Sequence, residues 1–305
     1  MNFSKNLPPL NRLLVLALSL MITTTFFAQN KSIARMGSTD TSSFDEGWLF
    51  SRYGLQPDGT RKEEPKDLEA TSLNDAAWQK LNLPHDWAIA GPFRSDLTGE
   101  TGKLPWKGIG WYRKHFTVPA SDAGKQIFVD FDGAMAYAKI WLNGKYVGTW
   151  PYGYNSFRMD LTPYIKPGQE NILAVRLDTE SWDSRWYPGG GIYRHVWLVK
   201  TNPVHVGHWG TYVTTPKISN ETAQVKLAVA VDNASNKKVK ATVNTTLFEL
   251  DVNNKPKTKV ASTKESVVEI NPGASVVANS EATISNPKRW DIISPNRYLA
   301  QTSIS

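Results

Sequence analysis

A single dipeptide places the strongest constraint on what this chain can fold into. Asn143-Gly144 stands between two runs, at 136–142 and 145–150, in which apolar and polar residues alternate. Both residues tolerate the positive φ that a two-residue hairpin turn requires. The sequence therefore predicts a tight antiparallel hairpin and a fold built from strands.

The same alternation recurs at spacings of about ten residues, which is typical of a β-sandwich, and helical periodicity is almost absent. Near residue 201 the composition changes, because tryptophan is dense before Trp209 and then occurs only at Trp290. The pattern predicts an all-β protein of two sandwiches, the second immunoglobulin-like. Short strands are expected at 78–83, 110–118, 126–133, 156–161, 171–178, 192–199, 224–231, 238–250, 266–270, 274–284 and 298–304.

The N-terminal segment has the pattern of a secretory signal. Lys5 and Arg12 precede an apolar run of 15 residues, 13–27, and the small residue Ala28 follows it. That run is shorter than the roughly 20 residues of a spanning helix. We expect a signal peptide over 1–28, a linker over 29–43, a first domain over 44–201 and a second over 202–305. The mature protein is then secreted or periplasmic, with no membrane segment.

Composition excludes several kinds of site. The chain has no cysteine, so disulfides and thiolate nucleophiles are ruled out. Its net charge is +7, but the basic residues are scattered, so nucleic acid is not an expected partner. His205 and His208 lie three apart in a non-helical stretch, which does not suit zinc. We expect no metal and no cofactor.

The richest stretch for binding runs from Arg185 to Trp197. Arg185, Trp186 and Tyr187 precede the glycine triplet 189–191, and alternation then predicts a strand from Ile192. Arginine donates to sugar hydroxyls, and aromatic rings stack on sugar faces. The alternatives are a salt bridge for Arg185 and core or interface packing for the two aromatic residues.

A second polar position follows the short strand at 78–83. His85 and Asp86 stand between Pro84 and Trp87 in otherwise apolar surroundings. They are candidates for the rim of a pocket. Alternatively, Asp86 caps the local turn by accepting hydrogen bonds from nearby backbone N–H groups.

Several motifs, in order and spacing, resemble the N-terminal part of glycoside hydrolase family 2, which contains β-galactosidases, β-glucuronidases and β-mannosidases. They stand at 83–87, 108–113, 140–148, 153–157 and 185–194. The resemblance covers roughly 44–305, and the β-galactosidase branch is the most similar. It implies a jelly-roll sugar-binding domain followed by an immunoglobulin-like domain.

In that family a third domain, a (β/α)8 barrel, carries both catalytic glutamates of a retaining mechanism. We expect that barrel to be absent here, so this chain has no catalytic residue. The pair Asn220-Glu221 is expected to be a solvated turn. Some relatives place a sodium-binding Asp where this chain has Arg185, which argues against sodium.

The resemblance implies a non-catalytic portion of an enzyme that hydrolyses terminal β-linked sugars in carbohydrate degradation. Its expected partners are a carbohydrate substrate and the barrel domain, and the full enzyme is expected to form a homo-oligomer. Two alternatives remain open. One is a stand-alone secreted carbohydrate-binding protein without hydrolase activity, and the other is a structural or adhesive β-sandwich.

Overall fold

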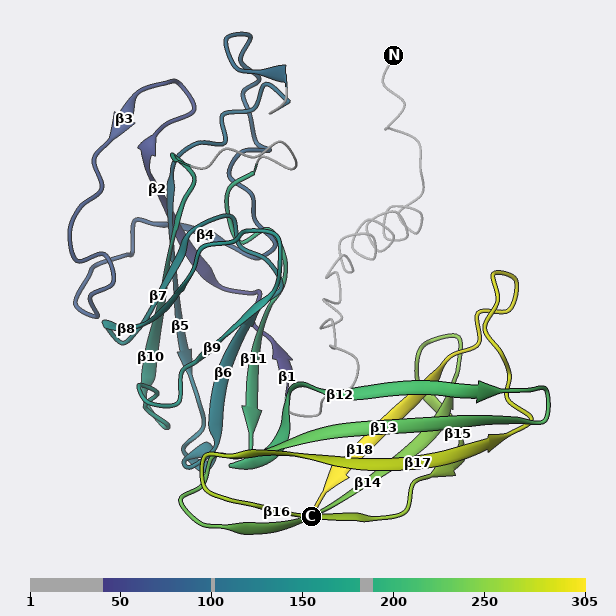
Figure 1. Ribbon diagram of the computed structural model, residues 1–305. Coiled ribbons are helices and arrows are strands. Elements are labelled where there is room, and N and C mark those ends of the chain that lie inside the picture. Colours follow the sequence, from purple (N-terminus) through teal and green to yellow (C-terminus); the bar gives the residue numbers. More distant parts are fainter. Residues whose placement is uncertain (1–40, 100–101, 182–188) are drawn as a thin grey trace, which may run out of the picture. The chain divides into compact units, whose positions relative to one another are not determined.

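The computed structural model describes residues 41–99, 102–181 and 189–305. These residues form strands β1 to β18 and the 3-10 helix η2 (Ala120–Asp122), which confirms the all-β class (Figure 1). No helix in this part of the chain is long and apolar enough to cross a membrane. Arg185, Trp186 and Tyr187 lie outside the described residues.

Two antiparallel sheets make up the first sandwich. One has the order β1-β11-β6-β9, and the other has the order β3-β2-β5-β10-β7-β8 with β4 also paired to β2. Their bounds are β1 (Thr41–Ser43), β2 (Trp48–Leu55), β3 (Arg61–Lys62), β4 (Gln79–Leu81), β5 (Ile109–Thr117), β6 (Gln126–Phe131), β7 (Ala138–Leu142), β8 (Lys145–Trp150), β9 (Phe157–Asp160), β10 (Glu170–Asp178) and β11 (Val196–Thr201).

Alternating apolar residues of these strands form the core between the two sheets. Ile127, Val129 and Phe131 of β6 are fully buried, as are Ile140 and Leu142 of β7. Each fully buried aliphatic or aromatic side chain contributes about 1.5–3 kcal/mol of transfer free energy. This burial explains why period-two alternation in the sequence identified these strands.

The predicted hairpin is confirmed. β7 and β8 pair on either side of Asn143 and Gly144, whose φ angles are +53° and +74°. The Asn143 amide also donates to Tyr164 O at 3.0 Å and to Asn171 Oδ1 at 2.8 Å. The turn is therefore tied both to the loop that precedes β10 and to the first residues of β10.

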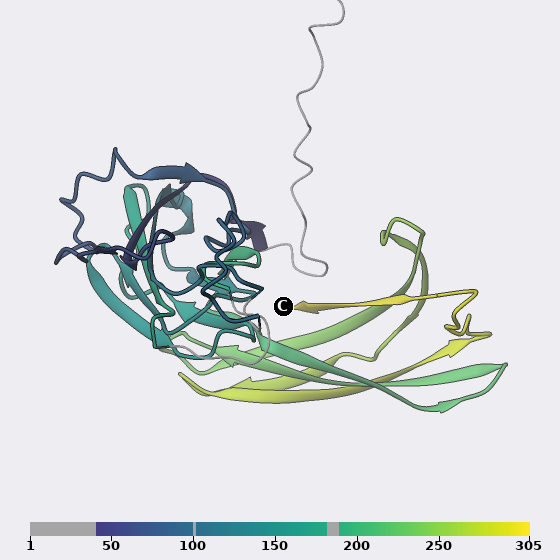
Figure 2. The same cartoon turned by 90° about the horizontal axis from the view of Figure 1, so that it is seen from above.

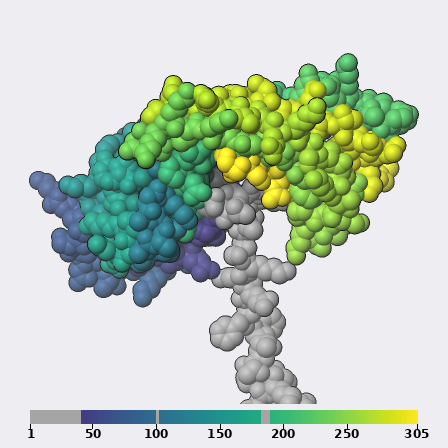
Figure 3. Space-filling model, turned by 90° about the horizontal axis from the view of Figure 1, so that it is seen from below, coloured from purple at the N-terminus to yellow at the C-terminus, as the bar shows by residue number. Residues whose placement is uncertain are grey.

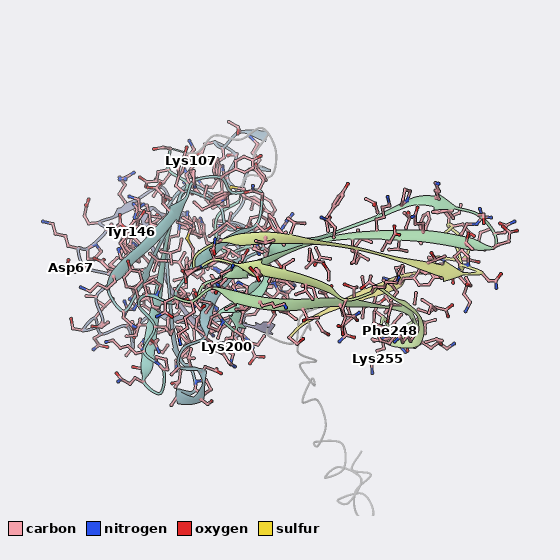
Figure 4. The ribbon with its side chains drawn as sticks, turned by 60° about the horizontal axis from the view of Figure 1, so that its bottom comes forward. Asp67, Lys107, Tyr146, Lys200, Phe248 and Lys255 are labelled. Atoms are coloured by element: carbon pink, nitrogen blue, oxygen red, sulfur yellow. The ribbon has the colours of Figure 1, made fainter. Side chains whose placement is uncertain are left out.

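The outer face of the larger sheet carries a second, smaller cluster. Trp111 and Trp141 stack with ring centroids 5.2 Å apart, and Leu68 from the loop before β4 is buried on the same cluster. Tyr146 of β8 packs edge-on against Trp141 and is 50% exposed. Tyr146 is labelled in Figure 4. A sheet that needed only one apolar face would not carry these rings, so the loop covers part of the second face.

The second sandwich also consists of two sheets, and its long strands run alongside each other (Figure 2). One sheet has the order β12-β13-β17, and in the other β14 pairs with β15, β16 and β18. Their bounds are β12 (Val204–Ile218), β13 (Thr222–Asn233), β14 (Val239–Leu250), β15 (Pro256–Ser262), β16 (Ser266–Ile270), β17 (Ser275–Ser285) and β18 (Tyr298–Ile304).

The core of this sandwich uses small β-branched and alanine side chains. Val225, Leu227, Val229 and Val231 of β13 are buried with residues of β14, β16 and β17. The chain has no cysteine, so apolar packing replaces the disulfide of antibody domains. The side chains of this sandwich, green to yellow, form a closely packed surface in Figure 3.

Three sequence-based expectations need correction. The strand expected at 192–199 begins at Val196, because residues 191–195 bond to other loops. Thr41–Ser43, expected as the end of the linker, pair with β11 as β1. No strand was expected at β2, β3, β12 or β15.

Candidate functional site

The two predicted binding segments are brought together. His85 N donates to Ile192 O, and Trp87 N donates to Gly190 O, both at 2.9 Å. These two bonds join the turn at 83–87 to residues 190–192 like the rungs of a short ladder. The described end of the Arg185 segment is therefore held against the His85–Asp86 turn.

Asp86 is the cap of this turn. Its Oδ1 accepts hydrogen bonds from Ala88 N at 2.7 Å and from Gly190 N at 3.3 Å, and the residue is only 8% exposed. The capping alternative is thereby confirmed. Since this oxygen serves the backbone of both segments, Asp86 positions them relative to each other.

Trp87 fills the space beneath the turn. A Cβ placed on Gly110 would lie 2.3 Å from its ring, and a Cβ on Gly190 would lie 2.2 Å from it. The indole Nε1 donates to Trp106 O at 2.8 Å, and Phe50 stacks on the ring with centroids 6.0 Å apart. Glycine is therefore required at both positions because a side chain would collide with the Trp87 ring, and not because the backbone adopts a positive φ.

Arg52 braces the loop on the other side of Trp87. Its guanidinium donates to Pro105 O and Lys107 O, both at 2.8 Å, and lies 5.9 Å from the Trp87 ring centroid. Burial lowers the pKa of Arg52 to about 10, although the charge of Asp86 opposes that shift. The group remains a cation at neutral pH.

His85 is half-buried beside the same aromatic residues. Its Nδ1 lies 2.7 Å from the Tyr112 hydroxyl, and its ring packs on Phe50 with centroids 4.7 Å apart. Burial lowers the pKa of His85 below its usual 6.5, with Asp86 opposing the shift. The imidazole is therefore neutral at pH 7 and acts as a hydrogen-bonding group.

A pocket of about 380 Å³ lies beside Pro84. It is lined by Pro84, Asp132, Ser156, Tyr193, Arg194 and His195. Sequence reasoning treated the last three as ordinary strand positions and missed this pocket. The motifs at 153–157 and 192–195 were visible, but nothing in one sequence shows that distant polar residues meet.

Buried partners hold several of the pocket groups in place. His195 Nδ1 lies 2.8 Å from Asp45 Oδ2, and Trp197 Nε1 donates to Asp132 Oδ2 at 2.8 Å. Tyr193 donates its hydroxyl to Gly153 O at 2.8 Å. Burial raises the pKa of Tyr193 above its usual value despite the opposing charge of Arg194, so the phenol stays protonated.

The described residues contain no group of three or more His, Cys, Asp or Glu side chains that could hold a metal ion. Asn220 and Glu221 lie in the exposed turn between β12 and β13, where Ser219 Oγ donates to Glu221 Oε2 at 2.8 Å. The expectation of a solvated turn is confirmed.

Comparison with known proteins decides the family. Residues 75–202 match the description "Glycosyl hydrolases family 2, sugar binding domain", and residues 204–305 match "Glycosyl hydrolases family 2". The chain belongs to glycosyl hydrolase family 2. The resemblance stated from the motifs is thereby confirmed, together with the jelly-roll and immunoglobulin-like pair of domains that it implied.

The relatives of this family 2 chain carry two activities in their names. It is 41% identical over 268 residues to "Beta-galactosidase BoGH2A" of Bacteroides ovatus, covering 87% of this chain and 30% of that protein. It is 35% identical over 266 residues to a "Putative beta-glucuronidase" of Formosa agariphila, covering 86% of this chain and 23% of the relative.

A crystal structure of a family 2 member from Bacteroides cellulosilyticus superposes with a TM-score of 0.76 at 36% identity, covering 87% of this chain and 33% of that chain. The chain thus spans about a third or less of the length of these relatives. It corresponds to the non-catalytic N-terminal portion of such enzymes.

Proposed function

We propose that the whole protein is a retaining β-glycosidase that hydrolyses terminal β-linked sugars, with β-galactosides as its substrates. The 41% identity to a protein named β-galactosidase supports the choice of sugar. In this proposal a barrel domain supplies the nucleophile and the acid, two carboxylates about 5 Å apart. The chain described here supplies one wall of the sugar pocket.

The observation that carries the proposal is the ladder between 83–87 and 190–192. It fixes the described end of the segment that contains Arg185, Trp186 and Tyr187 against a rigid, aromatic-packed turn. A loop that positions a sugar must itself be held in place by the residues packed behind it. We assign sugar contact to Arg185, Trp186 and Tyr187, and positioning of that segment to His85 and Asp86.

We further propose that residues 1–28 direct secretion or export to the periplasm, and that the mature domains span 41–201 and 202–305. The basic start and the apolar run of the N-terminal segment support this. N-terminal sequencing of the exported protein tests it. A mature protein that still begins at Met1 would contradict the proposal.

The substrate is tested with the protein expressed from the whole reading frame. We expect hydrolysis of 4-nitrophenyl β-galactoside at least about tenfold faster than of the matching β-glucuronide, because the uronate adds a charge that the site must desolvate and pair. A preference for the glucuronide would overturn the choice of sugar. Hydrolysis of neither substrate would overturn the proposed activity.

A further inference from the structure

The two flanks of the second sandwich are closed to different extents. On one flank, β17 contacts β15 and β16 of the facing sheet, and its core-facing residues Ala278, Ala282 and Ile284 are buried. Since β13 and β14 are the central strands of the two sheets, β12 and β18 lie on the opposite flank. We call this second side of the sandwich the β12–β18 flank.

Core-facing side chains of β12 are exposed on the β12–β18 flank. Val213 lies opposite Leu227 and Ile218 lies opposite Ala223, so the two members of each pair share one face of the sheet. Leu227 and Ala223 are buried, yet Val213 is 44% exposed and Ile218 is 52% exposed. In a sandwich the inner face of a strand is normally covered by the other sheet. Here the described residues leave the inner face of β12 partly uncovered.

One edge of β18 faces away from its sheet. Among the described strands, β18 pairs only with β14, in a regular antiparallel register. Ser305 and Thr242 donate backbone hydrogen bonds to each other, at 3.0 and 2.8 Å. Bonded and non-bonded pairs alternate along an antiparallel ladder. The N–H and C=O groups of Ala300, Thr302 and Ile304 therefore point away from β14, along the free edge.

The sequence of β18 does nothing to protect this edge. Proteins keep exposed edges from pairing with other strands by placing charges, prolines or bulges on them. The edge strand β15 carries Pro256, Lys257 and Lys259, and β12 is interrupted by two register shifts. β18 has no charged residue and no proline, and its register with β14 is unbroken. Its free edge is therefore suited to pair with a further strand.

We propose that the β12–β18 flank is a docking site for one further β-strand, supplied by the polypeptide that follows Ser305 in the whole protein. That strand runs antiparallel to β18, bonds to the free backbone groups of β18, and covers Val213 and Ile218 with its own apolar residues. Consecutive strands usually pair, and a short connection gives antiparallel pairing. The relatives are long enough to supply it, because the chain covers only 30% of one and 33% of another.

The inference rests on the proposed function in one respect, that the protein continues beyond Ser305. The docked strand would join the second sandwich, through main-chain hydrogen bonds, to the portion that carries the chemistry. The two proposals can fail separately, because strand pairing is measured without a substrate. An active protein with an unpaired β18 would overturn this inference alone, and an inactive protein with a paired β18 would overturn only the activity.

The test is amide hydrogen exchange, read residue by residue by mass spectrometry, in this chain and in the protein made from the whole reading frame. In this chain we expect alternation along β18, with fast exchange at Ala300 and Thr302 and slow exchange at Leu299 and Gln301. In the longer protein Ala300 and Thr302 should exchange at least about tenfold more slowly, because a bonded amide exchanges only when it opens. Residues 257–259 of the β15 edge are the control and should exchange equally in both proteins.

Proline substitutions at two neighbouring positions of β18 form a matched pair. Ala300→Pro removes an N–H group of the free edge, whereas Gln301→Pro removes one that bonds to β14. In this chain Gln301→Pro should lower the urea midpoint of unfolding more than Ala300→Pro does. In the longer protein Ala300→Pro should return Thr302 to the fast exchange that it has in this chain.

Several outcomes would overturn the proposal. Equal exchange at Ala300 and Thr302 in the two proteins would show that no strand docks there. Equal slowing at 257–259 would show a general stabilisation instead of docking at β18. Slow exchange in this chain that depends on its concentration would assign the edge to a second copy. Equal midpoints for Ala300→Pro and Gln301→Pro would show that the free edge is not the one described.

Discussion

At the residue scale, the indole of Trp87 depends on two glycines from separate segments. Replacing Gly190 by alanine would place a methyl group 2.2 Å from the ring, and the ring is held by Trp106 O and Phe50. Overpacking of this kind costs about 1–3 kcal/mol. We expect Gly190→Ala to lower the urea midpoint of unfolding accordingly.

Gly99→Ala is the control for that experiment. Apart from Gly99 itself and its neighbours in the chain, no atom of the described residues lies within 4 Å of a Cβ at this position, so the substitution should leave the midpoint nearly unchanged. Equal midpoints for the two variants would show that Trp87 moves aside without cost. In that case the rigid support assigned to the turn at 83–87 would be wrong.

The ionisation of Asp75 makes the free energy of unfolding depend on pH in the acidic range. Burial tends to raise its pKa, but hydrogen bonds from His115 and Arg113 outweigh it and lower the pKa below 3.8. A depressed carboxyl pKa stabilises the fold above the unfolded value, about 3.9, and this stability is lost as the pH falls through the folded value. We expect the free energy of unfolding to fall below about pH 5.

Asp75→Asn should flatten that decline. At pH 7 it should also cost up to about 3–5 kcal/mol, because Arg113 is fully buried and would lose its carboxylate. Glu269→Gln is the control, since its pair with Lys238 is about 60% exposed on both sides and contributes little to stability. An Asp75→Asn variant with the parent pH profile would contradict this account.

The ionisation of Lys114 makes the free energy of unfolding depend on pH in the basic range as well. Burial lowers its pKa to about 8, against opposing charges on Glu46 and Asp45, and its ammonium lies 4.4 Å from the Phe44 ring centroid. Because the folded chain binds the proton less tightly than the unfolded chain, stability should rise with pH between about 8 and about 10.4.

The titration itself is measurable with side-chain-labelled lysine. We expect one signal with a midpoint near pH 8, missing from the spectrum of Lys114→Arg. If no lysine signal moves between about pH 7 and 9, burial does not lower the pKa of Lys114.

At the element scale, the hairpin of β7 and β8 depends on Gly144, whose φ is +74°. A side chain there costs about 1–2 kcal/mol through contact with the backbone. We expect Gly144→Ala to lower the free energy of unfolding by about that amount. Lys145→Ala, one residue later at an exposed position, should change it by less than about 0.5 kcal/mol. Equal effects of the two substitutions would contradict the strain assigned to the turn.

Strands with clear alternation were predictable, whereas β2 and the mostly exposed strands β12 and β15 were not. β13 and β16 alternate because their neighbours bury one side, so the pattern is visible in the sequence. Among the strands that the structure describes, β12 pairs only with β13. It is mostly exposed and changes register between Val206 and Thr211, where Trp209 has a φ of +53°. Nothing in such a strand imposes alternation.

The start of β11 shows a second limit of predicting strands from alternation in the sequence. Ile192 to His195 alternate like a strand, but their backbone groups bond to His85 and Asp132 in separate loops. For the candidate site, sequence reasoning found His85 and Asp86 but not the pocket of Asp132, Ser156 and 193–195. Local pattern does not reveal which distant loops meet.

At the scale of the whole molecule, the described residues hold two large separate cores and no group suited to bind a metal. The ladder to which we assign a role in sugar recognition, between 83–87 and 190–192, lies in the first sandwich. This arrangement suits a chain that positions a sugar for chemistry carried out elsewhere in the protein.

The most direct test of that claim compares this chain with the protein made from the whole reading frame, at equal concentration, on 4-nitrophenyl β-galactoside. We expect turnover by the longer protein and none above the buffer rate by this chain, because family 2 chemistry needs two carboxylates that this portion does not supply. Turnover by this chain alone would contradict the account.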